Sequence, residues 1–143
     1  MIFALLSALS FAQTPDPAAW TPLPGDEEAT YAYRLLDTDA GGDLRRLVLR
    51  LTPVRAREFA HGEMVYDLDC PARTLTILSV RSIDADGAEL QAVTVPDEHR
   101  TADPVHADDG PTAALYARLC PEGAPLSPAP APPPPPIAVA PRN

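Results

Sequence analysis

The side chains best suited to binding a metal ion are the three histidines of the chain and the carboxylates near two of them. His99 and His106 lie in one polar loop, whereas His61 is distant in sequence. Their spacing matches no recognised zinc pattern, and carboxylates in loops are commonly just solvated. We therefore interpret this region as an exposed polar loop and predict neither a metal nor a cofactor. The full candidate set is His61, Glu98, His99, Asp103, His106, Asp108 and Asp109.

Acid–base catalysis needs paired carboxylates, and Asp67 and Asp69 stand two residues apart on one face of a predicted strand. We expect both to face water. The sequence contains no Gly-x-Ser-x-Gly elbow, no glycine-rich loop for a phosphate and no activated cysteine arrangement. We therefore predict no catalytic residues and no enzyme activity, with a metal-dependent hydrolase as an outside alternative.

Cys70 and Cys120 are the two cysteines of the chain. An even count favours a disulfide in an exported protein. A bond between cysteines this far apart in sequence would contribute about 4 kcal/mol in the chain-entropy model. Two buried free thiols remain the alternative, whereas a zinc site lacks a second cysteine or a histidine within ligand spacing.

An export signal is the best interpretation of residues 1–12, which are uncharged and mostly apolar and end in the small residues Ser10 and Ala12. No basic residue follows Met1, which leaves open an incomplete signal and a start further upstream. The run is too short to span a bilayer, since a span needs about 20 apolar residues. We predict a periplasmic or secreted protein of the bacterial cell envelope with no integral membrane span.

The charge balance argues against nucleic acid as a partner. Acidic side chains outnumber basic ones 20 to 11, and the net charge is -9. Such a surface repels a phosphate backbone.

Alternating apolar and polar residues predict a series of short strands. The pattern covers residues 31–35, 47–52, 64–70, 74–83 and 90–95, and Asp86-Gly87 predicts a tight hairpin before the last of these. No connection is long enough for a parallel crossover, so the strands should form an antiparallel meander.

A helix is predicted from Pro111 to Cys120, because Pro111 suits a first turn and Leu115 and Leu119 are four residues apart. So short a helix must pack on the sheet to be stable. Cys70 shares its strand face with apolar residues and Cys120 follows the apolar side of the helix, so both cysteines should point into one core.

The segment after Pro121 is rich in proline and offers few residues for a core. We expect a disordered tail at 122–143 that does not stabilise the domain, and it could act as a spacer or as a docking strand for an aromatic groove. The expected organisation is a signal at 1–12, a linker at 13–19, a domain at 20–121 and this tail.

Four features suggest a family. They are Trp20 opening the first strand, the segment Tyr66-Asp67-Leu68-Asp69-Cys70-Pro71-Ala72-Arg73 running into Thr74–Leu78, the hairpin Asp84–Gly87, and the late helix ending in Cys120. On these residues the chain from Trp20 to about Cys120 resembles the surface-adhesin protein E-like family of small bacterial envelope proteins. The resemblance implies an antiparallel sheet with a C-terminal helix tied to it by a Cys70–Cys120 bond. Its members include adhesins that bind host matrix proteins, and it supplies no catalytic motif.

The sequence thus predicts an α+β fold with one disulfide and a non-enzymatic exported envelope protein that serves as a binding or adhesin-like module. The partner would be a protein or another envelope component. The alternative function is that of a periplasmic enzyme inhibitor or an envelope stress factor.

Overall fold

The computed structural model describes residues 19–38, 42–55 and 57–134. The expected signal, and all but the last residue of the expected linker, lie outside the described residues. In chain order the elements are β1 Thr21–Leu23, β2 Ala29–Thr38, β3 Leu44–Pro53, β4 His61–Asp69, β5 Thr74–Ile83, β6 Glu89–Thr94, the short 3-10 helix η1 Asp97–His99, β7 Ala102–Pro104 and α1 Pro111–Leu119.

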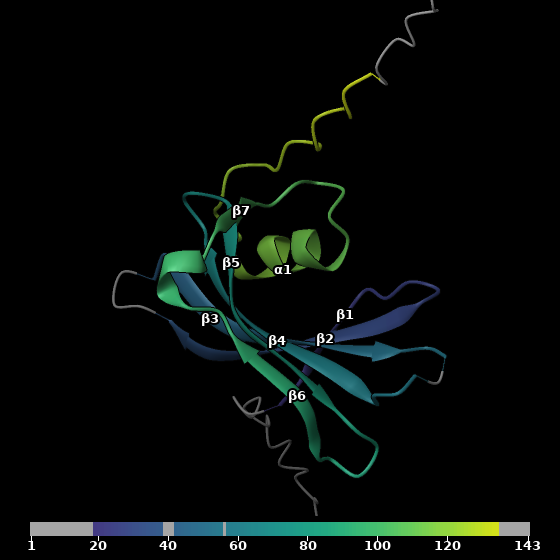
Figure 1. Cartoon of the computed structure of the whole chain (residues 1–143). Helices are drawn as coiled ribbons and strands as arrows, with labels where there is room; N and C mark the ends of the chain where they lie inside the picture. The colour runs from purple at the N-terminus through teal and green to yellow at the C-terminus, as the bar shows by residue number, and fades with distance from the viewer. Residues whose placement is uncertain (1–18, 39–41, 56, 135–143) are drawn as a thin grey trace, which may run out of the picture.

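Six strands form one antiparallel sheet in the order β1-β2-β3-β4-β5-β6 (Figure 1). β7 also pairs with β5, along the part of that strand that β6 leaves free. Neighbours in sequence are neighbours in space, as short connections between antiparallel strands require. The predicted meander and the α+β class are therefore confirmed.

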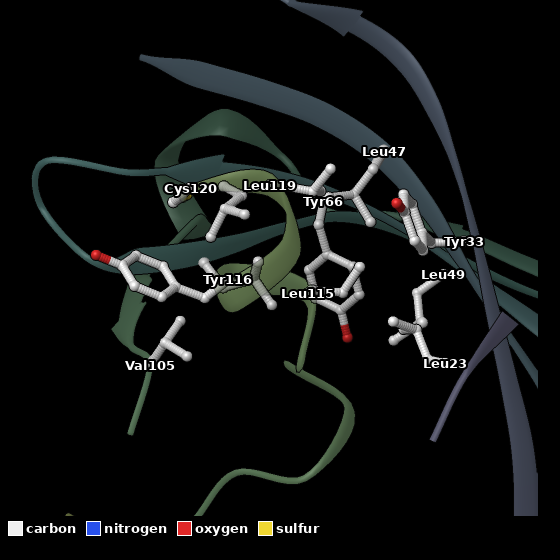
Figure 2. Packing of buried hydrophobic residues seen from close by; sticks show 12 residues of the cluster. Leu23, Tyr33, Leu47, Leu49, Tyr66, Val105, Leu115, Tyr116, Leu119 and Cys120 are labelled. Carbon is white, nitrogen blue, oxygen red and sulfur yellow. The ribbon is translucent and has the colours of Figure 1, made fainter. Parts of the chain in front are cut away.

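The core lies between the sheet and α1, on one side of the sheet (Figure 2). Strand alternation turns Leu47 and Leu49 of β3 and Leu68 of β4 to this side, and Leu115 meets them from the helix. Leu47, Leu68 and Leu115 are each 0% exposed. Burying a leucine of this kind stabilises a fold by roughly 1.5–3 kcal/mol, which explains how a nine-residue helix persists here.

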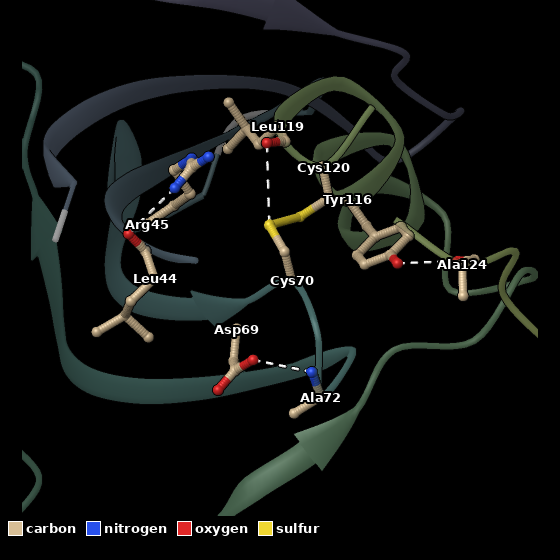
Figure 3. The surroundings of a disulfide bond; sticks show 9 residues. All are labelled: Leu44, Arg45, Asp69, Cys70, Ala72, Tyr116, Leu119, Cys120 and Ala124. Atoms are coloured by element: carbon tan, nitrogen blue, oxygen red, sulfur yellow. Dashed lines mark hydrogen bonds between the residues drawn. A yellow bond between two sulfur atoms is a disulfide. The ribbon is translucent and has the colours of Figure 1, made fainter. Parts of the chain in front are cut away.

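The helix begins at Pro111, as the sequence predicts, and ends at Leu119, one residue before the predicted end. Gly110 precedes it with φ 54, a backbone conformation that favours glycine, and Pro111 occupies the first turn. Cys120 follows the last helical residue and forms a disulfide with Cys70 at the end of β4, with 5.5 Å between the two Cα atoms (Figure 3). The predicted bond is thus present in the structure.

The first part of the proline-rich tail packs on the domain, which composition did not predict. Leu126 lies against the core cluster. Four hydrogen bonds hold the segment: Tyr116 Oη donates to the Ala124 carbonyl (2.8 Å), Arg73 Nη1 to the Pro125 carbonyl (3.3 Å), Ala107 N to the Ser127 carbonyl (2.9 Å) and Ala129 N to Asp108 Oδ1 (3.0 Å). The tail was expected to offer few residues for a core, and residues 124–129 nevertheless pack on the domain. Residues 130–134 are exposed and extend away from the domain (Figure 1).

Neither helix of the described residues has the length and apolar character needed to cross a membrane.

Candidate functional site

The side of the sheet turned away from α1 carries a cluster of charged side chains that no helix or strand of the described residues covers (Figure 1). Strand alternation places them there, because each follows or precedes a residue that faces the core. We call this surface the open face and define it by Arg34 on β2, Arg46 and Arg50 on β3, Glu63 and Asp67 on β4, and Arg81 on β5.

Glu63 is the centre of the open face. Antiparallel register sets it directly between Arg50 on one neighbouring strand and Arg81 on the other. Arg50 donates to Oε1 with Nε at 3.1 Å and Nη2 at 2.6 Å, and Arg81 donates to Oε2 with Nε at 2.9 Å and Nη2 at 2.5 Å. Glu63 is only 4% exposed, so both oxygens of a buried carboxylate are satisfied by guanidinium groups.

This arrangement holds Glu63 in its charged form. Burial raises the pKa of the carboxyl, but the hydrogen bonds and positive charges of Arg50 and Arg81 lower it by more. The pKa of Glu63 therefore lies below its ordinary value of 4.5. His61 lies alongside, with Nε2 at 3.5 Å from Oε1.

Trp20 lies over two of the arginines, just before β1. The guanidinium carbon of Arg50 is 3.8 Å from the centroid of its ring, and that of Arg34 is 5.1 Å from it. Both distances are within the range of cation–π attraction. Arg50 therefore joins the aromatic ring to Glu63, and we call Trp20, Arg34 and Arg50 the Trp–Arg stack.

Asp67 does not face water freely, contrary to the expectation from its strand position. It accepts hydrogen bonds from Arg46, from Nε at 2.7 Å and Nη2 at 2.8 Å, and its side chain is 16% exposed. Asp69 is separate, since its Oδ1 accepts the backbone N–H of Ala72 at 2.8 Å in the turn after β4 (Figure 3). The two carboxylates thus have different partners and do not form a catalytic pair.

The candidate metal ligands do not come together. Among the described residues no group of three or more histidine, cysteine, aspartate or glutamate side chains is arranged to hold a metal ion. His61 lies beside Glu63 on the sheet, whereas the backbone N–H of His106 donates to Asp109 Oδ2 at 2.6 Å in the loop before α1.

A hollow of about 640 Å³ lies beside the disulfide and is lined by Cys70, Cys120, Arg45 and the start of the tail. Its sulfur atoms are bonded to each other, so they supply neither a nucleophile nor a metal ligand. Cys70 Sγ lies 3.9 Å from the Leu119 carbonyl, a contact and not a hydrogen bond because a disulfide sulfur carries no proton (Figure 3). The two sulfur atoms that line this hollow therefore have a structural role.

Sequence reasoning identified the cysteines but missed the open face. The alternation placed Glu63 and Asp67 opposite the core, but it could not show that Glu63 is buried or which arginines meet it. That information resides in the pairing register of three strands, which depends on loop lengths and on irregularities such as the bulge at Val65/Tyr66. Six charged residues at strand positions that face away from the core were the available signal.

Comparisons of the chain with protein-family models, with curated proteins and with solved structures found no match.

Proposed function

We propose that this protein is a non-enzymatic exported envelope protein, a binding or adhesin-like module, and that it binds a protein or another envelope component through the open face. The observation that carries the proposal is the Trp–Arg stack on an uncovered sheet face. Tryptophan and arginine are enriched among the residues that dominate binding energy at protein interfaces. Side chains already held by one another also lose less freedom on binding than mobile ones.

Two observations support the cellular part of the proposal. A disulfide between Cys70 and Cys120 is typical of proteins in an oxidising compartment, such as the periplasm or the exterior. An antiparallel sheet joined by that bond to a C-terminal helix is also what the resemblance to the surface-adhesin protein E-like family implies.

Capture from a cell-envelope extract tests the proposal. The oxidised chain is immobilised as the parent, as Trp20→Ala and as Arg118→Ala, the last being a control on the exposed side of α1. We expect one saturable partner, confirmed by reciprocal capture with the purified partner, with at least tenfold weaker binding to Trp20→Ala and unchanged binding to the control.

Three outcomes would change the proposal. Equal binding to all three forms would place the interface elsewhere, and a version ending at Pro130 would then test the tail. The absence of any saturable partner would refute a binding function. If the partner is an enzyme whose turnover the chain blocks, the inhibitor alternative replaces adhesion.

A further inference from the structure

Three arginines of the open face each bind a carboxylate through the same two nitrogens. Arg46, Arg50 and Arg81 each donate through Nε and Nη2, at distances between 2.5 and 3.1 Å, to a carboxylate on a neighbouring strand. Arg46 places its two nitrogens on the two oxygens of Asp67, the fork geometry in which a planar guanidinium best matches a carboxylate, whereas Arg50 and Arg81 each place both nitrogens on one oxygen of Glu63. Each of these three arginines thus has a carboxylate partner on a neighbouring strand.

Arg34 is the exception. Its register position is beside Val48, which offers no carboxylate, and its guanidinium instead lies over the Trp20 ring. Among the described residues, Arg34 Nε is the only buried side-chain nitrogen or oxygen without a hydrogen-bond partner. Such atoms are rare in folded proteins because an unsatisfied buried donor is costly, and each one calls for an explanation.

We propose that Arg34 binds a carboxylate supplied by a partner, and that the partner presents a short acidic protein segment to the Trp–Arg stack. This inference rests on the proposed function and names the chemistry of the partner. A carboxylate from outside would give Arg34 the contact that Arg46, Arg50 and Arg81 already have. The ring of Trp20 would border the bound group, as aromatic residues do around buried ion pairs at interfaces.

The charges favour a short protein segment over a phosphate surface. The described part of the open face gathers four arginines against two carboxylates, Glu63 and Asp67, although the whole chain carries a net charge of -9. An anionic membrane extends well beyond the open face and would meet the acidic remainder of the surface. A segment of a few acidic residues meets the arginines alone.

Trp20 is the only tryptophan of the chain, so its fluorescence reports on this site directly. The full, oxidised protein is titrated with a capped hepta-glutamate peptide at low ionic strength. Hepta-lysine and vesicles containing phosphatidylglycerol serve as comparison probes. We expect a saturable change in emission with hepta-glutamate only, and we expect it to weaken as salt is added.

Variants of Arg34 then distinguish the contribution of its guanidinium geometry from that of its positive charge. Arg34→Gln should weaken the binding of hepta-glutamate at least tenfold, and Arg34→Lys should weaken it nearly as much because lysine lacks the fork. Arg118→Gln is the matched control and should bind like the parent. Thermal melting checks that each variant is folded, which is expected because no hydrogen bond joins the Arg34 side chain to another of the described residues.

Equal binding of hepta-glutamate to the parent and Arg34→Gln would overturn the inference, as would a preference for the vesicles. If hepta-glutamate does not change the Trp20 emission of the parent, but an envelope partner is still captured in a way that depends on Trp20, the partner is not an acidic segment. The proposed function would then remain intact. If the Trp20-dependent capture also fails, the proposed function itself is wrong.

Discussion

Replacing Glu63 by glutamine tests the centre of the open face, because the side chain keeps its shape and loses its charge. One oxygen of the amide can still accept from one arginine, but the NH2 group meets the other arginine, donor against donor. Removing one partner of a buried ion pair costs about 3–5 kcal/mol. The side chains of Arg50 and Arg81 are 31% and 49% exposed and regain water, so we expect the lower part of that range, about 3 kcal/mol, for Glu63→Gln at pH 7.

Equilibrium unfolding in urea with the disulfide intact measures this difference, and pH gives an independent check. The pKa of Glu63 is depressed in the folded state, so its stabilisation is complete above the unfolded value near 4.5 and is lost as pH falls through the lower folded value. The gap between parent and variant should therefore close below pH 4.5. Asp67→Asn is the control, and it should cost about 1 kcal/mol or less because Arg46 is 47% exposed. A variant as stable as the parent at pH 7, or a gap that persists in acid, would refute the reasoning.

Three further outcomes are expected. Cys120→Ser should lower the free energy of unfolding by about 2–5 kcal/mol and match the reduced parent in urea titrations, and a variant as stable as the oxidised parent would contradict this. Truncation after Glu122 should lower the melting temperature, because it removes Leu126 and the hydrogen bonds that hold residues 124–129 on the domain. Truncation after Pro130 keeps these contacts and should leave the melting temperature unchanged. Equal melting temperatures of the two forms would show that residues 124–129 do not stabilise the domain. Intact-mass analysis of the protein from its native envelope should show cleavage after about Ala12, and a cytoplasmic protein that retains the first residue would disprove export.

The sequence predicted the strands β2 to β6 and the helix α1 because local rules determine them, but it did not predict η1 or β7, which lie in the segment interpreted as an exposed polar loop. Alternation in Leu47-Val48-Leu49 and a proline before Leu115 leave little freedom in the type or order of the elements. The disulfide was predictable because the strand pattern turned Cys70 toward the core and the helix pattern turned Cys120 toward the same core. The docking of Leu126 was not, because a lone leucine among prolines has no period, and its burial depends on where Tyr116 and Arg73 place their donors.

All four basic residues that define the open face are arginine, and the structure gives arginine a role there that lysine could not fill. Val48 is 5% exposed and Glu63 is 4% exposed, although no helix or strand of the described part lies over them. Val48 is next to Arg34 in register and lies between Arg46 and Arg50 along its strand, so the aliphatic stems of arginines are the available cover. Lysine has a comparable stem, but it lacks the flat head that stacks on Trp20 and grips a carboxylate at two points. Arginine therefore both covers this face and orders its charges, and Arg34, which stacks on Trp20 and has no carboxylate partner among the described residues, is the arginine that the proposed acidic ligand would engage.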